Sequence, residues 1–202
     1  MFVHRALFQI QAMGHARDRV HLMDGSLADW EEQGGRLDKE PTKAIVADEL
    51  DLTKPTKYQA SDPINVVGME EINTIVAQGD QSDTILVDVR SPERFLGVVD
   101  EPRPGLRLGH MPAAKNLFFY SLLDPENNVR LKPVEELRTL IRNAGIDLET
   151  DKKIVISCGS GATACTLATA LDVCGRKPDN TYIYDGSWME YGATPDTIIT
   201  KD

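Results

Sequence analysis

The stretch Lys153-Ile154-Val155-Ile156-Ser157-Cys158-Gly159-Ser160-Gly161-Ala162-Thr163-Ala164 decides the fold of this chain. Its apolar run 154–156 predicts a buried parallel strand, and the run 163–174, closed by Gly175, predicts a helix. The glycine-rich turn between them directs backbone N–H groups and the positive end of the helix dipole at Cys158. Because a helix N-terminus favours thiolate over thiol, the pattern indicates a nucleophilic cysteine whose anionic intermediates are held by main-chain amides.

Other known turns share parts of this pattern. The run 159–164 fits the dinucleotide fingerprint G-x-G-x-x-A, but too few residues follow to build the rest of such a sheet. A Walker A loop would need Lys-Ser or Lys-Thr after the glycines, and a cysteine phosphatase would need an arginine where Ala164 stands. A buried core cysteine before a tight turn is the alternative that carries no chemistry.

Apolar runs and helical periodicity alternate through the rest of residues 64–202. The pattern predicts strands at 65–67, 84–89, 115–118, 153–157 and 181–184, and helices at 69–78, 133–144 and 163–174. Such alternation predicts an α/β fold with a central parallel sheet covered by helices on both faces. Ligands of such sheets bind beyond the carboxyl ends of the strands, where Cys158 and the segment 88–94 both fall.

Three separated motifs occur in one order along the chain. The first is Asp88-Val89-Arg90 with Arg94-Phe95-Leu96-Gly97 and Gly109-His110-Met111-Pro112-Ala113-Ala114. The second is Cys158-Gly159-Ser160-Gly161-Ala162-Thr163, and the third is Tyr184-Asp185-Gly186-Ser187-Trp188. This set resembles the 3-mercaptopyruvate sulfurtransferase family of the rhodanese superfamily from about Val66 to the end of the chain, with Ala162 in place of the usual valine. The resemblance implies the rhodanese-like three-layer form of the predicted fold.

The resemblance also implies a reaction. Cys158 would take sulfur from 3-mercaptopyruvate, release pyruvate and carry a persulfide, cradled by the backbone of Gly159, Gly161, Ala162, Thr163 and Ala164. A thiol acceptor such as thioredoxin, or cyanide, would then take the sulfur, and hydrogen sulfide can be released. No metal and no cofactor is implied. Two alternatives stay open, which are thiosulfate as the donor and a truncated persulfide carrier or binding module without turnover.

Three further side chains receive roles from the same resemblance. Arg94 and Arg103 would hold the carboxylate and ketone oxygens of the substrate, since a planar guanidinium binds a carboxylate through two hydrogen bonds. In the family the loop serine joins a relay with an aspartate and a histidine of a preceding domain, a part that this chain lacks. We therefore expect Ser160 to act on Cys158 as a hydrogen-bonding group.

The first 34 residues repeat the pattern of the C-terminal end. Gly175 follows Gly14 by 161 residues, and Asp185 and Tyr191 follow Asp24 and Trp30 by the same number. The pattern predicts a helix at 6–13, a strand at 19–23 and a short helix around Trp30. We interpret 1–34 as the remnant of a first, non-catalytic rhodanese domain, 35–63 as a linker and 64–202 as the complete catalytic domain. A strand without neighbours invites self-association, so we expect this fragment to associate.

The composition of the chain indicates which partners and which cellular compartment to expect. A net charge of −10 over 202 residues argues against nucleic acid and anionic membranes as partners. Three cysteines favour a reducing compartment, cytoplasmic or mitochondrial, and the first residues show no secretory signal. We expect Cys165 and Cys174 to pack in the core, Arg90 to pair with Asp88, His110 to be structural and Arg107 to be solvated.

Overall fold

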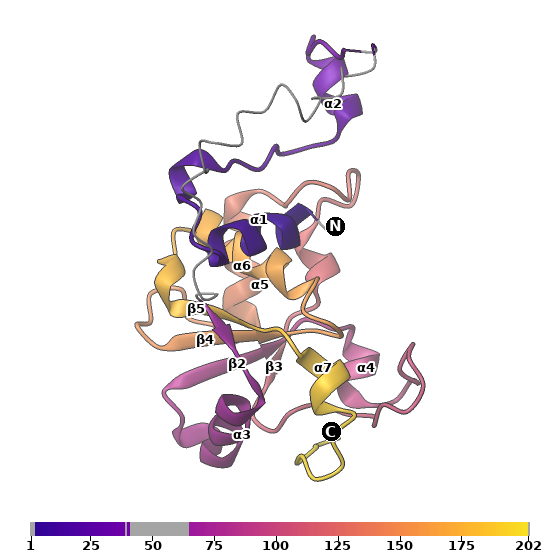
Figure 1. Ribbon diagram of the computed structural model, residues 1–202, viewed down its shortest axis with the longest axis vertical. Coiled ribbons are helices and arrows are strands. Elements are labelled where there is room, and N and C mark those ends of the chain that lie inside the picture. Colours follow the sequence, from indigo (N-terminus) through magenta and orange to yellow (C-terminus); the bar gives the residue numbers. More distant parts are fainter. Residues whose placement is uncertain (1–2, 39, 41–64, 202) are drawn as a thin grey trace, which may run out of the picture.

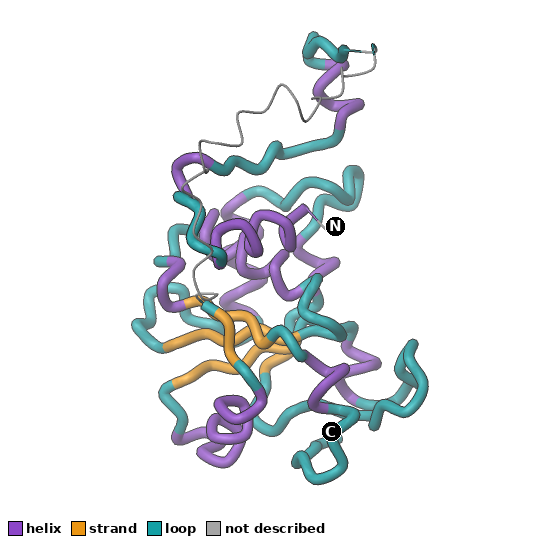
Figure 2. The backbone as a smooth tube through the Cα atoms, in the orientation of Figure 1, coloured by secondary structure: helices purple, strands orange, loops and turns teal. Residues whose placement is uncertain are grey.

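The central sheet confirms the predicted α/β architecture (Figures 1 and 2). The computed structural model describes residues 3–38, 40 and 65–201, so most of the predicted linker 35–63 lies outside the described residues. Five strands pair in parallel in the order β1-β5-β4-β2-β3. Their bounds are β1 Val66–Val67, β2 Thr84–Asp88, β3 Lys115–Asn116, β4 Lys153–Ser157 and β5 Thr181–Tyr184.

Helices bury both faces of this sheet (Figure 1). On one face, Ile154 and Ile156 pack with α5 and α6, and on the other Val155 packs with α3 and α7. This alternation explains why β4 is apolar at successive positions, since a strand covered on both faces has no solvent side. The helices are α3 Met69–Gln78, α4 Pro92–Leu96, α5 Val134–Asn143, α6 Ala164–Val173 and α7 Ser187–Tyr191.

Helix α4 is an element that the sequence patterns did not predict. It begins after Ser91 with proline in its first turn, a position where the missing N–H is not needed. It ends at Gly97, whose φ of 70° suits glycine, and a Cβ there would lie 2.7 Å from the Gly109 backbone N. The helix occupies the loop after β2 and brings Arg94 to the edge of the sheet where Cys158 lies.

The N-terminal segment reproduces the helices of the repeat but not its strand. Helix α1 spans Val3–Ala12, the 3₁₀-helix η1 spans Arg17–Arg19 and α2 spans Leu27–Glu32. Adding 161 to the residue numbers of α1 gives the bounds of α6, and adding 161 to those of η1 gives the bounds of the 3₁₀-helix η5, Pro178–Asn180. The strand predicted at 19–23 is wrong, because a strand needs a neighbour for its backbone groups and none of the described residues pairs with it.

Helix α1 packs along α6 and joins the body of residues 65–201. Phe8 packs against the core cluster beneath α6, and Nδ1 of the buried His4 lies 3.2 Å from Thr169 Oγ1. Burial lowers the pKa of His4 to about 4, so the ring is neutral in this contact at pH 7.

Helix α2 lies away from the sheet (Figure 1). Contacts of its N-terminal turn stabilise the helix and connect it to Arg130. Ser26 and Asp29 form a capping box, and Arg130 donates to Asp29 at 2.7 Å. Leu27 and Trp30 are 64% and 47% exposed. Because residues 19–23 form no strand, the self-association expected from a strand without neighbours loses that basis and stays a prediction. None of the helices in the described ranges is long and apolar enough to cross a bilayer.

Candidate active site

Cys158 follows directly on β4, at the carboxyl edge of the sheet. Strand β4 lies between β5 and β2, with Ser157 in register with Asp88, so the loops after β2 and β5 flank the cysteine. The Ser160 N–H donates to Cys158 Sγ at 3.4 Å, and the Cys158 side chain is 1% exposed. The predicted turn therefore does direct a main-chain amide at the sulfur.

Ser187 supports the cysteine from the loop after β5. Its hydroxyl accepts the Cys158 N–H at 3.1 Å and donates to the Tyr184 carbonyl at 2.8 Å. The neighbouring Trp188 N–H donates to the Cys158 carbonyl at 3.0 Å. Ser187 is fully buried with a φ of 52°, an unusual backbone conformation for a side chain with a Cβ. Its place in the motif 184–188 was a sequence signal, but its contact with Cys158 was missed.

We expect Ser187→Ala to lower the free energy of unfolding by about 1–3 kcal/mol, because the buried Cys158 N–H loses its acceptor. Ser187→Gly is the matched control, since glycine also lacks the hydroxyl but adopts a φ of 52° without strain. Both variants lose the hydroxyl, but only Ser187→Ala keeps a Cβ at this φ. Urea unfolding of the two variants therefore separates the loss of the hydrogen bond from the backbone strain. Unchanged stability in Ser187→Ala would contradict the role of the hydroxyl.

The loop 159–164 offers several backbone donors near the sulfur. Among the described residues, no acceptor is found for the N–H groups of Gly159, Gly161, Ala162 and Thr163. Gly161 has a φ of 76°, and a Cβ there would lie 2.8 Å from Asp185 Oδ1. Glycine at 161 is therefore required by both conformation and space. The half-buried Ser160 contributes its N–H to Cys158, and its hydroxyl makes no hydrogen bond with the described residues.

A network of alternating charges lies beside this loop. Arg90 donates to Asp88 at 2.6 Å and to Glu101 at 2.7 Å, and its guanidinium lies 4.1 Å from the centre of the Trp188 ring. Glu101 is almost fully buried and also accepts from Arg94 at 2.5 Å. The expected Arg90–Asp88 pair is confirmed. Two cations and two anions thus balance one another, which is the condition under which buried charges are tolerated.

Arg94 lies directly against the cysteine loop, whereas Arg103 does not. Arg94 Nη2 is 3.1 Å from the point where a Cβ on Gly159 would stand, and the side chain is 24% exposed. Glu101 occupies one edge of its guanidinium. Arg103 lies on an exposed part of the loop after α4, and none of the contacts found for the cysteine loop involves it. The geometry therefore favours Arg94 as the anion-binding side chain.

Arg107 and His110 hold the C-terminal segment and the α4 turn. The expectation that Arg107 is solvated is wrong, because its guanidinium donates to backbone carbonyls of Tyr191, Gly192, Thr194, Pro195 and Thr197. His110 Nδ1 is hydrogen-bonded to the Phe95 carbonyl at 2.8 Å, and the two rings stack at 3.6 Å. His110 is structural, as expected.

The other two cysteines are core residues, as expected. Cys165 and Cys174 are 0% and 3% exposed and belong to the cluster beneath α6. Burial raises the pKa of the Cys165 thiol to about 12, although Arg5 opposes the shift, and burial also raises the pKa of Cys174. Both groups therefore stay protonated at pH 7, when nucleophilic chemistry needs a thiolate.

Comparison with known proteins identifies the family of the chain. Residues 70–194 match the family described as Rhodanese-like domain. The chain is 34% identical over 200 residues to 3-mercaptopyruvate sulfurtransferase of Homo sapiens, covering 98% of this chain and 61% of that protein. It is 32% identical to thiosulfate/3-mercaptopyruvate sulfurtransferase 1, mitochondrial, of Arabidopsis thaliana, covering 96% of this chain and 52% of that protein.

Solved structures give the same result. The chain superposes on Tum1 of Saccharomyces cerevisiae with a TM-score of 0.77 and 26% identity, covering 99% of this chain and 66% of that one. It superposes on SseA of Escherichia coli, a 3-mercaptopyruvate sulfotransferase, with a TM-score of 0.67 and 27% identity, covering 92% and 62%. The chain thus spans less than two thirds of the curated relatives that it matches.

Proposed function

Because the chain belongs to the rhodanese-like domain family, we propose that it is a sulfurtransferase whose donor is 3-mercaptopyruvate. One observation carries the proposal: the Cys158 sulfur lies at the end of a central strand, with a main-chain N–H at 3.4 Å and the Arg94 guanidinium beside its loop. A nucleophile, anion-stabilising amides and a carboxylate-binding arginine are the parts that sulfur transfer from an α-keto acid needs.

The first step forms a persulfide on Cys158. The thiolate attacks the sulfur of 3-mercaptopyruvate, a sulfur–sulfur bond forms, and the carbon–sulfur bond breaks. The electron pair of that bond stays on carbon, so the enolate of pyruvate leaves and takes up a proton. Arg94 would bind the carboxylate, and Arg103 would complete the site from the loop after α4. Backbone N–H groups of residues 159–164 and the N-terminus of α6 would stabilise the charged sulfur.

The second step returns Cys158 to its thiolate form. A thiol acceptor attacks the outer sulfur and carries it away as a new persulfide, and a dithiol such as thioredoxin then closes to a disulfide and releases hydrogen sulfide. Ser160 stands next to the sulfur and would hydrogen-bond the persulfide. Thiosulfate is the alternative donor, with sulfite as its leaving group, but Gly159 and Ser160 bring no positive charge to meet a dianion.

We expect the purified chain to gain the mass of one sulfur atom on incubation with 3-mercaptopyruvate and to lose it to dithiothreitol, with repeated release of pyruvate. The measurements are intact mass and steady-state pyruvate production, each repeated with thiosulfate. A higher rate with thiosulfate would show that thiosulfate, and not 3-mercaptopyruvate, is the donor. Loading without turnover would indicate a persulfide carrier. If neither donor changes the mass of the protein, the proposal is wrong.

A further inference from the structure

Arg5, from the N-terminal segment outside the family match, reaches the loop that carries Cys158. Its Nη1 donates to Asp185 Oδ1 at 2.5 Å and to the Gly161 carbonyl at 3.4 Å. The Arg5 side chain is 21% exposed. Burial disfavours its charge, but the hydrogen bond and the negative charge of Asp185 outweigh this effect and raise its pKa. Arg5 therefore keeps its positive charge in this contact.

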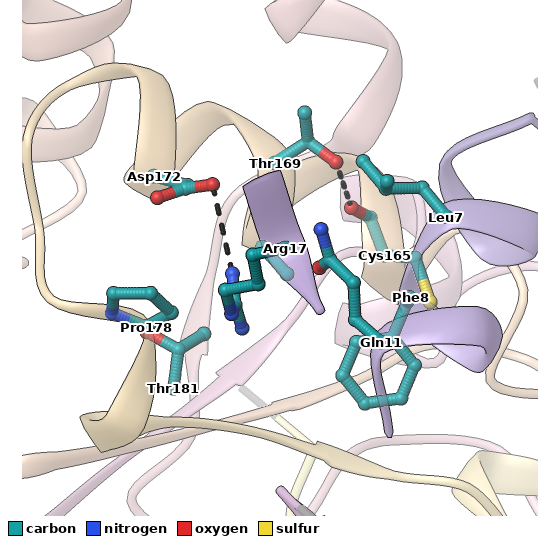
Figure 3. A pocket seen from close by; sticks show the side chains of 10 residues that line it. Leu7, Phe8, Gln11, Arg17, Cys165, Thr169, Asp172, Pro178 and Thr181 are labelled. Carbon is teal, nitrogen blue, oxygen red and sulfur yellow. Dashed lines mark hydrogen bonds and ion pairs between the residues drawn. The ribbon is translucent and has the colours of Figure 1, made fainter. Parts of the chain in front are cut away.

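The helix that carries Arg5 is fixed on α6 over its whole length. Leu7, Phe8 and Gln11 of α1 line a small cavity together with Cys165 and Thr169 of α6 (Figure 3). The contact between His4 and Thr169 anchors the first turn of α1. Beyond the helix, Arg17 forms a separate, solvent-exposed ion pair with Asp172 at 3.8 Å, which does not hold α1 in place (Figure 3). Arg5 thus acts from a rigid base, as a positioning group must.

The Gly161 carbonyl is the acceptor through which Arg5 acts on the loop. It also accepts from Cys165 Sγ at 3.4 Å, so two donors fix its direction. In a planar trans peptide the C=O of one residue and the N–H of the next point in opposite directions. With the Gly161 carbonyl turned to Arg5, the Ala162 N–H is turned away from Arg5. A Cβ on Gly161 would lie 3.2 Å from Arg5 Nη1, so the loop and the guanidinium fit each other closely.

We propose that Arg5 is a positioning residue for the Cys158 loop: it fixes the orientation of the Gly161–Ala162 peptide, whose N–H has no acceptor among the described residues and would stabilise negative charge on the reacting sulfur. This inference rests on the proposed sulfurtransferase function. It makes helix α1 part of the catalytic machinery, although α1 precedes the catalytic domain in sequence. The effect belongs to the transition state, where negative charge on sulfur needs the amide, and not to substrate binding.

The decisive variant is Arg5→Gln, and Arg17→Gln is its matched control. Both remove one positive charge from the same segment and one ion pair with an aspartate, but Arg17 pairs with Asp172 of α6 and not with the loop. We expect Arg5→Gln to slow single-turnover persulfide formation about tenfold and lower kcat equally, with KM within about twofold of the parent protein. Arg17→Gln should leave both unchanged.

A second readout does not depend on sulfur transfer. The rate at which iodoacetamide alkylates Cys158 reports its thiolate, and we expect the pH profile of this rate to move upward in Arg5→Gln and to stay in place in Arg17→Gln. Arg5→Met removes the charge and both hydrogen bonds but keeps a long side chain against α6, and it serves if the glutamine variant does not fold. Parental loading rates and an unshifted profile in a folded Arg5 variant would overturn the inference. A parent protein that loads no sulfur overturns the proposed function instead, and the alkylation profile still decides the role of Arg5.

Discussion

Replacing Cys158 by serine should abolish persulfide formation. A neutral hydroxyl lacks the nucleophilicity of a thiolate and forms no stable bond to a transferred sulfur. The hydroxyl is smaller than the thiol but stays within the same backbone contacts to Ser187 and Trp188, so we expect the variant to fold. The measurement is intact mass after incubation with 3-mercaptopyruvate, where the gain of one sulfur expected of the parent protein should be absent.

Cys165→Ser and Cys174→Ser are the matched controls for this exchange. Both side chains are buried thiols whose raised pKa keeps them protonated, so neither should carry sulfur. We expect both variants to gain the same mass as the parent, with some loss of stability where a hydroxyl enters an apolar cluster. A mass gain that survives in Cys158→Ser would show that the nucleophile is another residue.

Arg94→Lys should lower kcat/KM for 3-mercaptopyruvate at least about tenfold, which is about 1.4 kcal/mol. Lysine keeps the positive charge but not the planar fork, and Glu101 already engages one edge of the Arg94 guanidinium. The ammonium of lysine would be drawn to Glu101 and leave the substrate carboxylate without a partner. Steady-state rates with 3-mercaptopyruvate and with thiosulfate, which has no carboxylate, provide the comparison.

The contrast between the two donors is the internal control for Arg94. A loss confined to 3-mercaptopyruvate supports carboxylate binding, whereas equal losses would mean that Arg94 maintains the loop structure. The same exchange at the exposed Arg103 tests the second part of the proposed carboxylate site, and there too we expect a loss confined to 3-mercaptopyruvate. Thermal unfolding of each variant identifies any loss that comes from instability.

The elements predicted well were those whose signal is local. Strand 153–157 and helix 69–78 were predicted with the bounds that the structure gives, because β4 is apolar on both faces and α3 has helical periodicity. The segment 19–23 occupies the position of β5 in the 161-residue repeat and still forms no strand. A strand depends on hydrogen bonds to a neighbour, and the sequence of the segment itself does not contain that neighbour.

The contacts of the site were harder to predict because they join distant residues. The turn after β4 could be identified from the cysteine, the glycines and the following helix. The partners Ser187 and Arg5 lie on other elements, and no periodicity connects them with Cys158. Arg107 was misread for the same reason, since an arginine with five backbone acceptors has the same sequence signature as a solvated one.

Helices α1 and α6 are equivalent elements of the repeat, 161 residues apart, and they pack against each other. His4 contacts Thr169. At the offset of 161 residues, His4 corresponds to Cys165 and Phe8 corresponds to Thr169, and Phe8 and Cys165 line one cavity. Such reciprocity is the property of an isologous contact, in which a surface meets its own copy around a twofold axis. Here both surfaces belong to one polypeptide, so the contact forms at an intramolecular effective concentration. The position of Arg5 above the Cys158 loop is therefore independent of dilution, which a contact between separate subunits would not be.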